Sequence, residues 1–159
     1  MKEGRAKIFP IPAPQAGQLR KLAAAGRSSS VILINGLAET DRPRLVADLS
    51  RIVDRPVERV PLAQVVSRYI GETEKNLVRR FVMAQRTGAI LLFDEADALF
   101  GKRSEVSDSH DRYANLQAGH LLAVMEQYEG LVMLATSDRV TVDAERARFL
   151  LWVLERPDP

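Results

Sequence analysis

Ile90-Leu-Leu-Phe-Asp-Glu-Ala-Asp97 decides the fold and carries the clearest chemical signal in the sequence. Its apolar first half predicts a strand buried on both faces, and two carboxylates follow directly at the end of that strand. Asp94 and Glu95 at this place suit a hydrated Mg²⁺ ion, which keeps most of its waters and takes one or two carboxylates together with substrate phosphate. Asp94 would hold the metal, and Glu95 would polarise an attacking water. The alternative is that both acids only favour the N-terminus of a following helix through its dipole.

The rest of the chain alternates apolar runs with amphipathic segments, and this alternation predicts the fold class. Besides 89–93, strands are expected at 31–35, 57–60, 131–135 and 150–154. Helices are expected at 16–25, 43–53, 74–87 and 111–128, with shorter ones at 62–67 and 143–149, and Thr73 is expected to cap the helix that starts at residue 74. Such alternation is typical of an α/β fold with a parallel sheet covered on both faces. In these sheets ligands bind at the carboxyl ends of the strands.

Length and composition limit the possible functions. A chain of 159 residues with 46% hydrophobic residues can form one domain with a buried core. The chain has no cysteine, which excludes disulfides, thiolate metal sites and a thiol nucleophile, and is compatible with a cytoplasmic location. A net charge of +2 gives no argument for nucleic acid. No apolar run approaches the ~18 residues of a membrane span. On these two grounds, charge and hydropathy, neither nucleic acid nor a membrane is an expected partner. Residues 1–30 are expected to form a basic, proline-containing arm, and residues 31–159 the core domain.

Four stretches together resemble the AAA+ ATPases in order and spacing. They are Arg68–Asn76 (RYIGETEKN), Ile90–Asp97, Phe100–Glu105 (FGKRSE) and Leu134–Arg139 (LATSDR). The resemblance runs from about residue 30 to residue 157. It implies a P-loop NTPase-like three-layer sandwich with a five-stranded parallel sheet, and ATP and Mg²⁺ as cofactors. It also places Asp94 and Glu95 in the Walker B motif, as the metal-site residue and the catalytic residue.

The resemblance places a P-loop, G-x-x-x-x-G-K-[ST], after the first strand, where this chain reads GLAETDRP. Gly36 and Thr40 agree with the family, which makes them cofactor-binding candidates together with Arg42 and Asp94. Asp41 replaces the second glycine and adds a negative charge where phosphate would lie. Arg42 replaces the lysine and lacks its compact ammonium. Pro43 removes the metal-ligating hydroxyl and one backbone N–H. The Walker A motif is therefore degenerate, and weak or lost binding of Mg-ATP is expected.

The resemblance also implies roles at two further places. Ser137 stands where the family's sensor asparagine orients the attacking water. Arg148, or alternatively Arg146, would reach the γ-phosphate of a neighbouring subunit, although Phe149 stands where the principal arginine is expected. The alternative for both arginines is a surface position on a short helix.

Tyr69, Ile70 and Gly71 resemble the first pore loop of AAA+ rings, in which an aromatic side chain grips an unfolded polypeptide. Aromatic contacts are non-directional and so tolerate many sequences. The alternative is a tyrosine packed at a junction between a helix and a loop.

Two functions remain open on the sequence alone. The first is an AAA+ ATPase module that remodels a polypeptide substrate in a homo- or hetero-oligomeric ring. The second is a catalytically inactive pseudo-ATPase that acts as a scaffold or regulatory subunit. The chain ends at Pro159, shortly after the last expected strand, where the family continues into a helical lid. A truncated core and a natural protein without a lid both agree with this.

Overall fold

The computed structural model describes residues 11–25, 29–69, 71–100 and 109–155, and its centre is a five-stranded sheet with the order β2-β3-β4-β1-β5. Every neighbouring pair of strands is parallel. The strands are β1 (Ser30–Asn35), β2 (Val57–Pro61), β3 (Ile90–Asp94), β4 (Leu131–Ala135) and β5 (Trp152–Glu155). This arrangement confirms the predicted α/β fold with a five-stranded parallel sheet.

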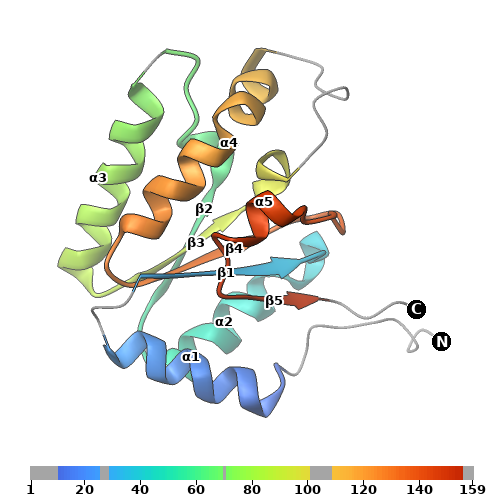
Figure 1. Cartoon of the computed structure of the whole chain (residues 1–159). Helices are drawn as coiled ribbons and strands as arrows, with labels where there is room; N and C mark the ends of the chain where they lie inside the picture. Colours follow the sequence, from blue (N-terminus) through green and yellow to red (C-terminus); the bar gives the residue numbers. More distant parts are fainter. Residues whose placement is uncertain (1–10, 26–28, 70, 101–108, 156–159) are drawn as a thin grey trace.

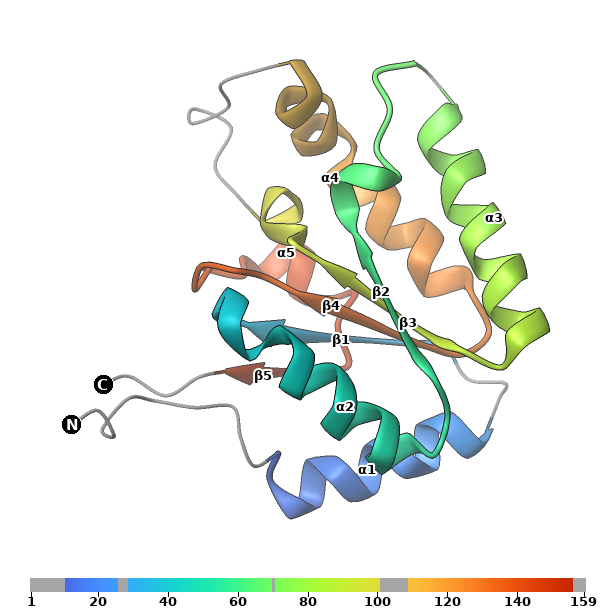
Figure 2. The same ribbon diagram turned by 180° about the vertical axis from the view of Figure 1, so that it is seen from behind.

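Helices cover both faces of the sheet (Figures 1 and 2). The pair α1 (Ala13–Ala25) and α2 (Arg42–Val53) lies on one face, and the pair α3 (Glu72–Thr87) and α4 (Ser109–Gln127) lies on the other. A short α5 (Ala144–Ala147) follows β4, and single 3₁₀ turns occupy Glu39–Asp41, Leu62–Gln64 and Ala96–Leu99. No helix in the described part of the chain is long and apolar enough to span a bilayer.

The core has two halves, separated by the sheet. Alternate residues of each central strand point to opposite faces, so that Leu91 and Phe93 pack against α3 and α4, whereas Leu92 packs against α1 and α2. The central strands β1, β3 and β4 are buried along their whole length, which explains their continuous apolar sequences. The edge strand β5 is only partly covered, and its Trp152 packs against the half of the core that contains α1 and α2.

The start of α3 differs from the expectation. Thr73 was expected to cap this helix, but α3 begins at Glu72, and Gly71 occupies the N-cap position with a φ of 83°. The Thr73 hydroxyl instead accepts the backbone N–H of Ser67 at 2.8 Å and donates to the carbonyl of the same residue at 3.2 Å. The prediction of a Thr73 cap was therefore wrong, because this side chain fastens the preceding loop to the helix.

Candidate functional site

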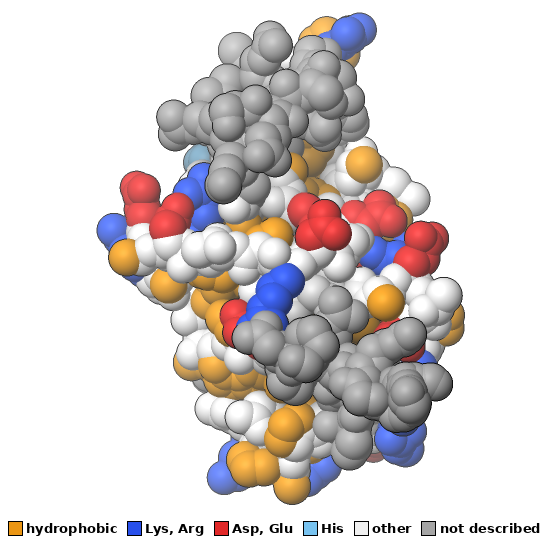
Figure 3. Space-filling model, turned by 90° about the vertical axis from the view of Figure 1, so that its right-hand side faces the viewer, with side chains coloured by type: hydrophobic (Ala, Val, Ile, Leu, Met, Phe, Trp, Pro, Cys, Tyr) orange, Lys and Arg blue, Asp and Glu red, His pale blue; other side chains and the backbone are white. Residues whose placement is uncertain are grey.

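The carboxyl ends of the central strands bring three distant segments of the chain together. Gly36 follows β1, Asp94 ends β3, and Ser137 lies two residues beyond β4. Figure 3 shows the face of the molecule toward which the arrows of β1 and β5 point in Figure 1. Acidic side chains (red) lie close to basic ones (blue) on this face. Parallel strands place their carboxyl ends on one edge of a sheet, so the candidate residues at these strand ends are neighbours in space.

The Asp94 carboxylate is fully buried and already has partners within the chain. Its Oδ1 accepts the backbone N–H of Glu95 at 2.7 Å. Its Oδ2 lies 2.7 Å from Nε of Arg42 and 2.5 Å from Nε of Arg59. Two guanidinium groups therefore meet at one carboxylate oxygen. Glu95 has a left-handed backbone with a φ of 55°, and its side chain is 45% exposed and 4.0 Å from Nη2 of Arg59.

Arg42 connects the candidate P-loop to the ends of two strands. It is the first residue of α2, and its side chain is only 4% exposed. Its Nη2 donates to the Ser137 hydroxyl after β4. Its Nε faces Asp94 as an ion pair without hydrogen-bond geometry. We call the set formed by Arg42, Arg59, Asp94 and the Ser137 hydroxyl the ion cluster.

Two further residues, Arg59 and Asp97, shape this edge of the sheet, and neither was a predicted site residue. Arg59 belongs to β2, whose register places it opposite Leu92 of β3, two residues before Asp94. Asp97 accepts the backbone N–H groups of Ser137 at 3.0 Å and of Asp138 at 2.9 Å, so it fixes the segment after β4. The sequence signal for Arg59 was a charged residue inside an expected strand. Its pairing with Asp94 could be predicted only by knowing that β2 and β3 are neighbours in the sheet.

Backbone N–H groups in the candidate P-loop donate to acceptors inside the chain. Because Pro43 has no N–H, five of the eight loop positions from 36 to 43 have no backbone N–H left for an anion. The internal pairs are Gly36 to Oγ1 of Thr136 (3.0 Å), Leu37 to the carbonyl of Thr136 (2.7 Å), Asp41 to the carbonyl of Ala38 (2.9 Å) and Arg42 to the carbonyl of Glu39. Thr40 lies within this segment, between Glu39 and Asp41, and it is exposed.

The two arginines near α5 are in different situations. Arg146 is held by its own chain, because its Nε donates to the carbonyl of Leu99 at 2.5 Å and its Nη1 to Asp143 at 2.8 Å. The backbone N–H of Arg146 donates to Asp143 as well, and this hydrogen bond holds the pKa of the carboxyl below its ordinary value. Arg148 is exposed, and its guanidinium lies 5.8 Å from the centre of the Phe149 ring. Of the two, Arg148 is therefore the one that a neighbouring molecule can reach.

Tyr69 lies apart from the ion cluster, in the loop between β2 and α3. Its side chain is 59% exposed, and the guanidinium of Arg68 lies 5.5 Å from the centre of its ring. The hydroxyl of Ser67 accepts the backbone N–H of Tyr69 at 3.1 Å, which fixes the base of the loop. Gly71 is the N-cap of α3, and Ile70 lies outside the described residues.

The model of the ATPase family associated with various cellular activities (AAA) matches residues 32–150, which is most of the chain. The chain belongs to this family. An uncharacterized AAA family ATPase, y4kL of Sinorhizobium fredii, is 33% identical over 107 residues, which are 65% of this chain and 32% of the relative. The chain therefore spans about a third of the length of this curated AAA relative.

A solved AAA structure confirms the fold. The crystal structure of the FIGL-1 AAA domain in complex with ADP superposes with a TM-score of 0.58, at 16% sequence identity, over 97% of this chain and 55% of that one. At this level of identity the likeness concerns the fold. The sheet order and the layers described above are therefore those of an AAA core.

The family binds ATP together with Mg²⁺, so the fit of these ligands can be tested against the geometry. Asp94, the candidate metal ligand, has both carboxylate oxygens engaged, one of them by two guanidinium groups. The loop amides that donate within the chain and the missing N–H of Pro43 act in the same direction. The residues present therefore do not fit Mg-ATP in the arrangement described here.

Proposed function

We propose that this chain is an AAA module of a protein-remodelling assembly in which turnover of Mg-ATP is weak or lost. The observation that carries the proposal is the ion cluster. In it, Arg42, which stands at the lysine position of the P-loop, is paired with the carboxylate that would serve the metal. A positive charge supplied by the protein thus stands between the P-loop helix and the end of β3.

Binding of ATP would require this arrangement to open. Freeing Asp94 for a metal separates it from Arg42, which is 4% exposed. Removing one partner of a buried ion pair costs about 3–5 kcal/mol. Because a bound phosphate would itself face Arg42, this range is an upper limit, and it corresponds to an affinity lower by at most a factor of roughly 4,000. Glu39 adds only a weak repulsion for a triphosphate, because its side chain is 86% exposed and water screens its charge.

The second part of the proposal concerns the protein partner. We propose that the ring of Tyr69 contacts a polypeptide and that Arg148 contacts a neighbouring subunit, because both side chains are exposed. Neither contact needs a nucleotide on this chain. In its strongest form, the proposal is a pseudo-ATPase that serves as a scaffold or regulatory subunit in a homo- or hetero-oligomeric ring. The competing function is an active ATPase, which the exposed Glu95 beside Asp94 favours.

Calorimetry and a phosphate-release assay separate the two functions. We expect the wild-type chain to bind Mg-ATP no more tightly than roughly 1 mM and to release no phosphate above background. The variant Asp41→Gly/Arg42→Lys/Pro43→Thr restores the P-loop pattern, and we expect it to bind at least tenfold more tightly than wild type.

Two results would count against this proposal. Micromolar binding by the wild-type chain, with turnover that Glu95→Gln abolishes, would establish an active ATPase. If the restored variant binds no more tightly than wild type, the P-loop substitutions and the ion cluster are not the cause of the weak binding.

A further inference from the structure

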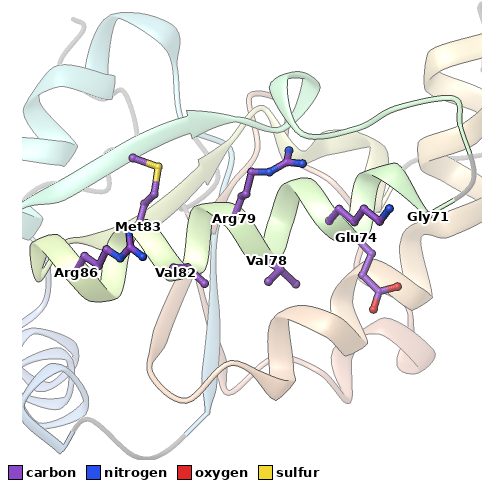
Figure 4. A pocket seen from close by; sticks show the side chains of 8 residues that line it. Gly71, Glu74, Val78, Arg79, Val82, Met83 and Arg86 are labelled. Carbon is purple, nitrogen blue, oxygen red and sulfur yellow. The ribbon is translucent and has the colours of Figure 1, made fainter.

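The outward side of α3 carries apolar side chains that the described residues leave uncovered. Val78, Val82 and Met83 are 48%, 41% and 57% exposed. They lie on the solvent side of the helix, because Leu77 and Phe81 of the same helix are buried in the core. Figure 4 shows Val78 and Val82 projecting from one side of α3, and Met83 from the other.

These side chains border an open, shallow surface depression of about 750 Å³, whose described lining comes from α3 and its N-cap alone. Its described lining extends from Gly71 at one end to Arg86 at the other. A helix of 16 residues is about 24 Å long, so the groove has the length of a short helix. We call it the α3 groove.

The charges along the α3 groove are mainly positive. Lys75, Arg79 and Arg86 line it, and Glu74 is the acidic residue among its described lining. The carboxylate of Glu74 is turned toward α4, where its Oε1 lies 3.2 Å from Nε2 of His120. None of the three basic side chains forms an ion pair with another described residue.

We infer that the α3 groove docks an amphipathic helix of a partner protein whose apolar face is flanked by Asp and Glu. The apolar side chains Val78 and Val82 are one helical turn apart, so they form an apolar strip along α3 against which the apolar face of a second helix can pack. The basic residues beside them would pair with the carboxylates of the partner, which sets its orientation and speeds its association. This inference does not depend on the nucleotide site.

Charge argues against two other occupants. The N-terminal residues 1–10, which lie outside the described ranges, contain Lys2, Arg5 and Lys7 against Glu3, so they carry the same sign as the groove. Two copies of α3 packed against each other would bring their basic residues together. An acidic partner helix satisfies both the apolar strip and the charges.

The test uses the full chain and a synthetic probe. The probe is a fluorescein-labelled helical peptide of about 16 residues, long enough to match α3, with a leucine face and glutamate flanks. Its matched control has lysine in place of glutamate. Fluorescence anisotropy measures binding at about 0.1 M and about 1 M NaCl, because salt screens exposed charges. Amide chemical shifts of the protein locate the bound peptide.

We expect the glutamate peptide to bind with shifts confined to α3 and its neighbours, more weakly at high salt, and the lysine peptide not to bind. Val82→Asp and Arg86→Glu should each weaken binding at least tenfold. Arg51→Glu makes the same charge change on α2, where Arg51 is 72% exposed, and should leave the affinity within twofold. Unchanged circular dichroism and Tm show that each variant is folded.

Three results would overturn the inference. The first is no binding of the glutamate peptide, or equal binding of the two peptides. The second is a set of shifts that maps away from α3. The third is a wild-type dimer in light scattering that Val82→Asp dissociates, because a second copy of the chain would then be the occupant.

Discussion

Replacing Asp94 with asparagine tests the ion cluster directly. Asparagine keeps the shape of the side chain and an oxygen that accepts the Glu95 N–H, but it removes the charge that Arg42 faces at 2.7 Å. Among the described residues, the other carboxylate that pairs with Arg42 is that of Glu39, at 3.9 Å and 86% exposed, which is too well solvated to replace the lost carboxylate.

The expected loss of stability is about 3–5 kcal/mol, because Arg42 is left buried without a counter-ion. Arg59 contributes less to this loss, since its side chain is 39% exposed and water can solvate it. In a domain of this size, 1 kcal/mol corresponds to a Tm change of about 2–4 °C. Asp94→Asn should therefore lower Tm by about 6–20 °C.

Urea unfolding followed by far-UV circular dichroism measures the effect, with Arg42→Met and the double variant completing a cycle. We expect the double variant to be more stable than the sum of the two losses predicts, by at least about 1 kcal/mol. Glu95→Gln is the matched control, because its side chain is 45% exposed and its loss should cost less than about 1 kcal/mol. If Asp94 were instead an unpaired metal ligand, Asp94→Asn would leave stability unchanged or raise it. A loss below about 1 kcal/mol without coupling refutes the ion cluster as described.

Three further predictions follow from single contacts. Tyr69→Ala should change the free energy of unfolding by no more than about 0.5 kcal/mol relative to wild type, but abolish binding of a labelled unfolded polypeptide. Tyr69→Phe should retain this binding, because it keeps the ring. Equal binding by the two variants excludes a contact through the ring. Asp143 has a pKa lowered from 3.8 by the Arg146 N–H, so its stabilisation of α5 is present above pH 3.8 and is lost as pH falls through the lowered pKa. An NMR titration of its carboxyl that gives a pKa at or above 3.8 contradicts this. Gly36→Ala, at φ +88°, should cost about 1–2 kcal/mol in urea unfolding, whereas Gly119→Ala, in the open on α4, should raise stability by up to about 1 kcal/mol.

The strands of the sheet could be predicted because burial leaves a local mark on the sequence. The runs at β1, β3 and β4 are continuous because helices cover both of their faces. The acids after β3 could be placed at the sheet edge for the same reason, since they directly follow the most apolar run. Both inferences need only neighbours in sequence.

The partners of those acids could not be predicted, because they come from other strands. Arg59 reaches Asp94 only because β2 lies beside β3, and the sequence does not state the strand order. Thr73 was misassigned for a similar reason. A threonine at this position can cap the helix or form hydrogen bonds with the preceding loop. Only the path of that loop, which brings the backbone of Ser67 to the Thr73 hydroxyl, decides between the two.

The position of Trp152 gives the chain an optical reporter of its edge strand. It is the only tryptophan of the sequence, and it lies on β5, which pairs with β1 and with no other strand among the described residues. Intrinsic fluorescence therefore follows the docking of β5 onto β1, whereas far-UV circular dichroism follows mainly the helices. Coincidence of the two unfolding curves would mean that the edge strand and the helical layers melt as one cooperative unit. A fluorescence change at lower urea would instead mark β5 as a separately opening segment, with its own local stability.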